Sequence, residues 1–284
     1  MLIINEIRRG ASARAARFRH SLPSRRGASF TLAVIGLFAL SSSSDAALKV
    51  YYLRHAEGGH NVVKEWARVP KAQRPDYVGN ANVFTPKGKA QVAAVTEKLQ
   101  KYHFDFIGVS SMWRTRNTIL PYLKAASAKG EIWPELHEFG GGAKILATNL
   151  PAVPKPVLSA GRRVELPAEE APYFTFRPDA RNDFKLPSGE GDEREAADQL
   201  MVQRVVDMVR QRFGGTDKSI LLVGHGNAGR ALLRRLTNQK LANIPSMVNA
   251  ELWMVEQQSD GSFQLEMYND APCGKNGPAP ARRE

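Results

Sequence analysis

Short apolar runs, rich in β-branched and aromatic residues, recur along the chain and predict the strands of a sheet. A run that is apolar throughout is typical of a central strand that is covered on both faces. Strands are expected over 48–53, 104–109 and 219–224, and the last of these is the run that is apolar throughout. Two further runs, 252–255 and 263–267, flank Asp260-Gly261 and are predicted to form a hairpin.

Segments with apolar residues at helical spacing lie between these runs. Thr85-Pro86 marks the start of the first, with Thr as N-cap and Pro at the first helical position, and its apolar residues continue to Leu99. The longest begins at about Glu193 and is ended by Gly214-Gly215. Two other helices are expected over 114–126 and 228–236.

Strands that alternate with helices predict an α/β fold, a three-layer α/β/α sandwich around a mostly parallel central sheet. The expected domain covers residues 47–268. Within it, 140–190 is rich in Pro and Gly and has no long period, so we expect an insertion or lid over the edge of the sheet. Residues 269–284 are rich in Pro, Gly, Lys and Arg and predict a disordered tail.

The first 46 residues have the order of a secretory signal. A basic stretch ends at Arg25-Arg26, an apolar run covers 30–40, and small residues with a cleavage-like Ser44-Asp45-Ala46 follow. The apolar run is too short to span about 30 Å of hydrocarbon. We therefore expect 1–46 to be a signal or targeting segment and the protein to be secreted or periplasmic, with membrane contact only during export. A disordered basic tail is the alternative, and whether the leader is cleaved stays open.

The net charge of +12 is divided between this segment and the rest. Seven arginines against two acidic residues give 1–46 a net +5, which leaves +7 for the remainder. That charge suits a small anionic substrate. Nucleic acid is not an expected partner, since no binding motif and no alternation of basic and aromatic residues is found. The single Cys273 excludes an intrachain disulfide and a cysteine-rich metal site.

Two histidines directly follow predicted strands. His55 stands after the first strand in Arg54-His-Ala-Glu-Gly-Gly-His-Asn61, and His225 stands after the strand 219–224. Ligands of open α/β sheets bind at the carboxyl ends of the strands, so the two would meet if those strands are neighbours. Either histidine alone could instead cap its strand. His55 and His60 are five residues apart with two glycines between them, which argues against a zinc-binding pair on one helix face.

Five blocks, in order, resemble the signatures of the histidine phosphatase superfamily, in its phosphoglycerate mutase-like branch. They are Leu53-Arg-His-Ala-Glu57 with Asn61, Phe84-Thr-Pro-Lys-Gly-Lys-Ala-Gln91, Ser110-Ser-Met-Trp-Arg-Thr-Arg-Asn-Thr118, Leu136-His-Glu138 and Val223-Gly-His-Gly226. Ala56 stands where the family commonly has Gly, and Ser111 where it has Pro. Neither change removes a reacting group.

The resemblance implies roles for the reactive and phosphate-binding side chains of these blocks. His55 is expected to be the nucleophile, as a neutral imidazole, and Glu138 the proton donor, with Glu135 as its rival. Arg54, Asn61, Arg114 and a protonated or donating His225 are expected to bind the phosphoryl group, His225 also acting in catalysis. Arginine suits this task because its planar fork matches phosphate, and like charge nearby favours the neutral form of His55.

These roles predict an exported phosphoric monoester hydrolase of the histidine acid phosphatase type, which acts on a small phosphorylated substrate through a phosphohistidine. No metal or cofactor is expected. A phosphoglycerate mutase-type phosphotransferase and a catalytically inactive phosphate-binding homologue are the alternatives. The substrate itself is not indicated by these residues.

Overall fold

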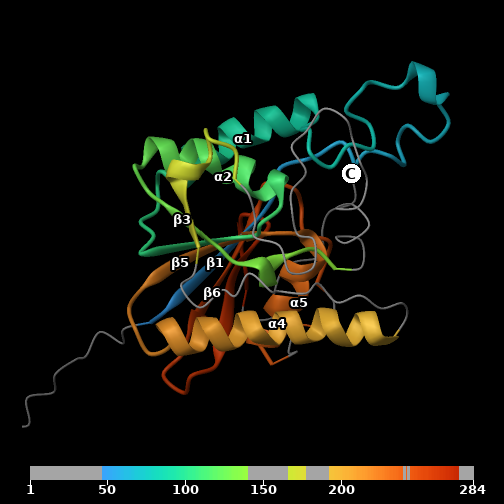
Figure 1. Ribbon diagram of the computed structural model, residues 1–284. Coiled ribbons are helices and arrows are strands. Elements are labelled where there is room, and N and C mark those ends of the chain that lie inside the picture. Colours follow the sequence, from blue (N-terminus) through green and yellow to red (C-terminus); the bar gives the residue numbers. More distant parts are fainter. Residues whose placement is uncertain (1–46, 140–165, 177–191, 239–240, 242–243, 275–284) are drawn as a thin grey trace, which may run out of the picture. The chain divides into compact units, whose positions relative to one another are not determined.

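The computed structural model (Figure 1) describes residues 47–139, 166–176, 192–238, 241 and 244–274. The predicted signal segment 1–46 and most of the predicted insertion 140–190 lie outside the described residues. None of the helices in the described part is both long and apolar enough to cross a membrane.

The described strands form one sheet in the order β4-β3-β2-β5-β1-β6-β7-β8. β4, β3, β2, β5 and β1 run parallel, while β6, β7 and β8 add an antiparallel edge. The predicted mostly parallel sheet is therefore confirmed. The strands are β1 (Lys49–Arg54), β2 (Phe106–Val109), β3 (Gly130–Ile132), β4 (Phe174–Phe176), β5 (Ser219–Gly224), β6 (Leu252–Gln257), β7 (Phe263–Tyr268) and β8 (Ala271–Pro272).

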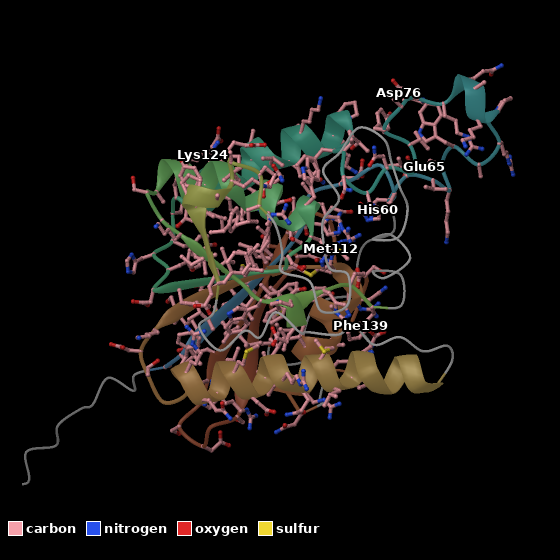
Figure 2. All side chains as sticks on the ribbon, in the orientation of Figure 1. His60, Glu65, Asp76, Met112, Lys124 and Phe139 are labelled. Atoms are coloured by element: carbon pink, nitrogen blue, oxygen red, sulfur yellow. The ribbon has the colours of Figure 1, made fainter. Side chains whose placement is uncertain are left out.

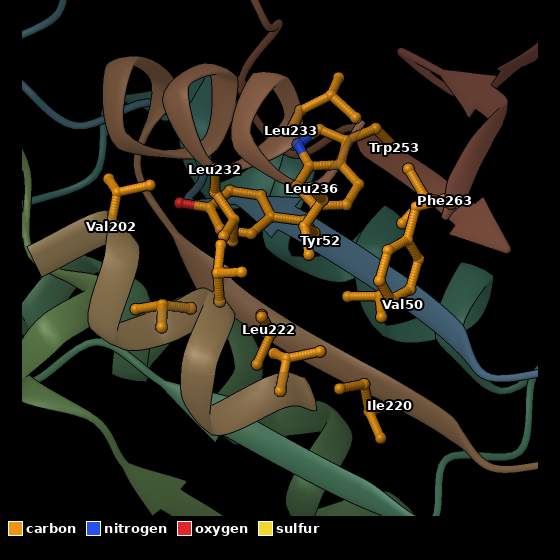
Figure 3. Packing of buried hydrophobic residues seen from close by; sticks show 14 of the residues in the cluster. Val50, Tyr52, Val202, Ile220, Leu222, Leu232, Leu233, Leu236, Trp253 and Phe263 are labelled. Carbon is orange, nitrogen blue, oxygen red and sulfur yellow. The ribbon is translucent and has the colours of Figure 1, made fainter. Parts of the chain in front are cut away.

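Helices cover both faces of the sheet (Figure 1). α1 (Pro86–Leu99) and α2 (Trp113–Ala125) pack together on one face, and α4 (Asp192–Phe213) and α5 (Gly226–Leu236) on the other. Alternate residues of β1 serve the two layers: Tyr51 and Leu53 pack towards α1 and α2, and Val50 and Tyr52 towards α4 and α5 (Figure 3). The three-layer α/β/α sandwich predicted from the sequence is thus the observed architecture, and its central strands are apolar because both faces are buried.

Three short strands were not expected from the sequence. β3 and β4 extend the parallel sheet at one edge, and β4 belongs to the described part of the predicted insertion. The prediction of a disordered tail from residue 269 is wrong for its first residues, because β8 pairs with β7. Asp270 also binds the backbone N–H of Leu252 through its carboxylate at 3.0 Å.

A buried ion pair ties the segment 166–176 to α2. Arg116 Nε lies 2.5 Å from Glu170 Oε2, and both side chains are almost completely buried. Asn117 Nδ2 donates to the other carboxylate oxygen of Glu170 at 2.9 Å. This part of the predicted insertion is therefore anchored beside the first turns of α2, next to the residues of the third sequence block.

Short 3-10 turns complete the described elements. They cover Lys71–Gln73, Pro134–Leu136 and Ala171–Tyr173. The turn Pro134–Leu136 follows β3 directly and brings Glu138 to the carboxyl end of the parallel strands, the end at which His55 and His225 also stand. Figure 2 labels His60, Met112 and Phe139 at this end of the sheet.

Candidate active site

Strand pairing brings His55 and His225 together. β1 and β5 are parallel neighbours in a register that places Arg54 opposite Gly224, so each histidine is the first residue beyond its strand. The backbone N–H of His55 donates to Gly224 O at 3.0 Å, and the two imidazole centroids lie 5.2 Å apart. The sequence prediction that the two histidines meet is confirmed, because the strands they follow are adjacent.

The surroundings of His55 define its tautomer. Nδ1 lies 2.7 Å from the carbonyl oxygen of Ala56, and a carbonyl can only accept, so Nδ1 carries the proton. Nε2 therefore presents its lone pair, which accepts from Arg114 Nε at 3.3 Å. The pKa of His55 lies well below its ordinary value because of burial first, and then because of Arg114, His60 and Arg54. The imidazole is neutral at neutral pH, as a nucleophile must be.

Arg114 connects the two histidines from the first turn of α2. Its Nη2 lies 3.1 Å from His225 Nδ1, while its Nε faces His55. Burial lowers the pKa of Arg114 to about 10, so the guanidinium stays charged at neutral pH. A buried arginine whose Nε and Nη2 face imidazoles is a cation suited to an anionic group.

The surroundings of His225 also define its tautomer. Because a guanidinium cannot accept, Nδ1 of His225 is the acceptor, and the proton lies on Nε2, 3.0 Å from Ser110 Oγ. Burial, followed by Arg114 and the other histidines, holds the pKa of His225 well below its ordinary value. In this arrangement Arg114 is the donor, and a phosphate-binding role for His225 stays a prediction.

Tyr52 positions His225 and was missed by the sequence analysis. Its hydroxyl donates to the carbonyl oxygen of His225 at 2.9 Å and accepts from the backbone N–H of the same residue at 2.6 Å. The ring stacks on Trp253 with centroids 5.0 Å apart. Gly224 and Gly229 leave the space that the tyrosine ring occupies, since a Cβ at either glycine would overlap it. Aromatic residues in β1 were interpreted only as strand formers, so no sequence signal separated Tyr52 from Tyr51.

The loop after β1 is held by its own backbone and by α1. Asn61 Oδ1 accepts from the N–H of Gly58 at 2.9 Å, which leaves the amide nitrogen of Asn61 as the group that can donate. Thr85, the N-cap of α1, donates its hydroxyl to Glu57 at 2.7 Å. Gly59 has no room for a side chain because a Cβ would overlap the carbonyl of Tyr77. These contacts explain why this loop needs its glycines and its Asn.

Arg54, the last residue of β1, lies under the same site. Its Nη1 donates to the carbonyl oxygen of Met247, while Nε is buried and has no hydrogen-bond partner among the described residues. Burial lowers its pKa, and the carboxyl of Glu138 is the largest influence that opposes this. The structure therefore places Arg54 with Arg114 and Glu138, as the predicted roles require.

Glu138 joins the site from the segment after β3. Its Oε1 accepts from its neighbour Phe139 at 2.8 Å and from the N–H of Ala228, in the first turn of α5, at 3.2 Å. Burial raises the pKa of Glu138 despite these bonds and despite Arg114 and Arg54. Glu138, rather than Glu135, is the carboxyl whose charge acts on both arginines, while Glu135 is buried within the preceding 3-10 turn.

Residues 50–145 match the family model of the histidine phosphatase superfamily, branch 1. The matched range includes His55, Arg114 and Glu138, and the parallel neighbour β5 adds His225 from outside it. The family match covers this part of the chain. The match supports a phosphatase or phosphotransferase activity, and it agrees with the family resemblance predicted from the five sequence blocks.

Several solved structures resemble this chain at low sequence identity. "Mycobacterial hydrolase 1" is 19% identical with a TM-score of 0.51, and the alignment covers 79% of this chain and 99% of that one. A mycobacterial glucosyl-3-phosphoglycerate phosphatase is 17% identical (TM-score 0.49, coverage 79% and 100%), and a phosphoserine phosphatase from Entamoeba histolytica is 17% identical (TM-score 0.45, coverage 78% and 96%). The first of these shows the shared fold. A search of curated proteins finds no match to the sequence.

His60, like Tyr52, is a residue of the site that was not predicted from the sequence. It was considered only as half of a metal-binding pair with His55. Its ring lies 5.4 Å from that of His55, centroid to centroid, and its electrostatic influence reaches both His55 and His225. Within the described residues no group of three or more His, Cys, Asp or Glu side chains is arranged to hold a metal ion.

Proposed function

We propose that this protein is an exported phosphatase that hydrolyses phosphate monoesters through a phosphohistidine formed at Nε2 of His55. The observation that carries the proposal is the hydrogen bond from Nδ1 to the carbonyl of Ala56, 2.7 Å long, in a buried and neutral imidazole. This bond directs the lone pair of Nε2 towards Arg114. A phosphoryl group beside Arg114 would therefore meet the nucleophilic atom.

The first half of the reaction transfers the phosphoryl group to His55. The Nε2 lone pair attacks phosphorus, and the bond between phosphorus and the ester oxygen breaks. Arg114 and Arg54 stabilise the negative charge that is spread over the equatorial oxygens. Glu138 gives its proton to the leaving oxygen, so that an alcohol departs. The raised pKa of Glu138 supports this assignment, because a general acid must hold a proton at the working pH.

The second half returns the enzyme to its starting state. Glu138, now a carboxylate, takes a proton from water as the water oxygen attacks phosphorus. The N–P bond breaks, its electron pair returns to Nε2 of His55, and inorganic phosphate leaves. Both hydrogen bonds from backbone N–H groups fall on Oε1 of Glu138, which leaves Oε2 to carry the proton in each half reaction.

Hydrolysis of an aryl phosphate with excess EDTA, across pH 4 to 8, tests this route. We expect turnover that resists EDTA and falls about a thousandfold or more in His55→Ala. His103→Ala is the matched control, since its side chain is 89% exposed and lies before β2, away from the site. A rapid quench with labelled substrate should trap an acid-labile, base-stable phosphoenzyme in the parent protein and none in His55→Ala. Metal-dependent turnover, or turnover that survives His55→Ala, would overturn the mechanism.

The export part of the proposal rests on the basic, apolar and small-residue order of residues 1–46. Bacterial expression of the full chain, followed by cell fractionation and intact mass measurement, tests it. We expect the protein in the periplasm or medium with a mass reduced by the leader. An uncleaved protein confined to the cytoplasm would contradict export.

A further inference from the structure

His60 faces the nucleophile from the loop after β1. The two imidazole centroids are 5.4 Å apart with the ring planes inclined by 39°, and His225 lies at 5.2 Å on another side of His55. Figure 2 shows His60 at the end of the sheet where Met112 and Phe139 follow β2 and β3. His60 is therefore one of the side chains that lie beside the imidazole of His55.

Backbone hydrogen bonds of the neighbouring residues hold the chain on both sides of His60. Gly59 on one side donates to the carbonyl of Val83 at 2.9 Å, and Asn61 on the other donates to Gly58 at 2.9 Å. Nδ1 of His60 is buried and has no hydrogen-bond partner among the described residues. It packs against Gly58, where an added Cβ would lie 2.9 Å from Nδ1. An imidazole kept only for structure would be expected to satisfy this nitrogen, because leaving a buried polar atom unpaired is unfavourable.

The unpaired Nδ1 defines which nitrogen of His60 can act. A neutral imidazole carries one proton, and a buried N–H without an acceptor is rarer than a buried acceptor without a donor. The proton is therefore best placed on Nε2. No hydrogen bond to Nε2 is found in the described part of the chain, so this N–H is available to a ligand.

The charges around His60 are cationic. Arg114 and Arg54 act on it, and together with burial they lower its pKa to about 3. A neutral histidine in this position adds a directed donor without adding a third positive charge. Such a donor suits a phosphoryl group whose charge is already stabilised by two arginines.

We propose that His60 is a third histidine of the phosphoryl site, whose Nε2–H donates a hydrogen bond to a non-bridging oxygen of the phosphoryl group at His55. This inference rests on the proposed function and adds a substrate-binding residue to it. His60 stabilises the group on the side of the site formed by the loop after β1, while Arg114 holds the side formed by α2. No bond to His60 is made or broken in the reaction.

Kinetics on three His60 variants separate the two ring nitrogens. In His60→Gln the amide nitrogen can occupy the position of Nε2, whereas in His60→Asn it reaches only the position of Nδ1. His60→Ala removes both. We expect kcat/KM for an aryl phosphate to fall about tenfold to a hundredfold in the Ala and Asn variants, with a similar rise in the inhibition constant of inorganic phosphate, and to remain within about fivefold in the Gln variant. His103→Gln should match the parent protein.

The opposite pattern would overturn the proposal. Full activity in His60→Ala, or rescue by Asn instead of Gln, would assign His60 a structural role through Nδ1. Thermal unfolding of each variant shows whether it is folded, and if the Ala variant is not, the Gln and Asn pair still decides. Turnover that survives His55→Ala would refute the proposed function separately. If the parent protein hydrolyses no substrate, the binding of inorganic phosphate is measured by ³¹P NMR instead. Weaker binding in His60→Asn than in His60→Gln supports the inference, and equal binding refutes it.

Discussion

Acidification should destabilise this protein through His60 in a way that one substitution can isolate. Burial, and then Arg114 and Arg54, lower the pKa of His60 from an ordinary value of 6.5 to about 3. Below the ordinary value the unfolded chain binds a proton at this residue and the native protein does not. The unfolded state is therefore favoured as the pH falls, and the stability is lost progressively between pH 6.5 and about 3.

The size of the effect follows from this difference in pKa. A pH of about 4.5 lies about two units below the pKa of His60 in the unfolded chain, so that histidine is protonated there. In the native protein His60 is still almost entirely neutral at this pH. Each unit corresponds to about 1.4 kcal/mol, so His60 alone should reduce the free energy of unfolding by about 2–3 kcal/mol relative to about pH 7.5. His55 and His225 act in the same direction, since burial lowers their pKa values too.

Urea unfolding of the parent protein and of His60→Gln, at about pH 7.5 and pH 4.5, isolates the contribution of His60. Glutamine does not titrate, so the free energy of unfolding of the variant should gain about 2–3 kcal/mol relative to the parent protein between the two pH values. Effects of groups that do not interact with His60 cancel in this double difference. His103→Gln is the control, because the His103 side chain is 89% exposed. The same difference in stability between parent and His60→Gln at both pH values would refute the burial of His60 beside the two arginines.

Three further predictions concern Tyr52, the segment 166–176 and Glu138. Gly229→Ala should lower the free energy of unfolding by about 1–3 kcal/mol in urea titrations, because its Cβ would overlap the Tyr52 ring; parent-like stability would show that the ring can move. Glu170→Gln should cost about 3–5 kcal/mol in the same assay, since it leaves Arg116 buried and unpaired, and a loss below about 1 kcal/mol would contradict that burial. In the parent protein kcat/KM should fall as the pH rises through the raised pKa of Glu138, because the acid must be protonated. The variant Glu138→Gln should lose this decrease at high pH. A pH profile that is the same in both proteins would exclude Glu138 as the proton donor.

Local patterns in the sequence were sufficient to predict the central elements. The strands β1, β2 and β5 are apolar because both faces are covered, and that property can be read from each segment alone. α1 carries its own start signal, since Thr85 caps it by accepting from the N–H of Gly88 at 2.9 Å. The loops that carry His55 and His225 could be placed at one edge for the same reason, as they follow strands that the alternating pattern makes parallel.

Pairings between distant segments could not be predicted in this way. β3 and β4 have three residues each and pair Gly130 with Phe174, so neither has a periodic pattern of its own. β8 consists of Ala271 and Pro272, in a stretch whose composition alone is typical of disorder. These strands exist because an already formed edge offers them backbone hydrogen bonds, and an edge is a property of the assembled sheet.

The site likewise has features that the sequence predicts and features that depend on the tertiary structure. The sequence by itself, through its resemblance to the family, indicated the reactive side chains His55, Arg114 and Glu138. Only the tertiary structure decided their states, because burial is the largest cause of the shifted pKa in each of these groups, and burial depends on every layer packed around them. The tautomer of His225, the support from Tyr52 and the approach of His60 to His55 likewise depend on contacts between segments that are far apart in the chain or on the exact course of a loop.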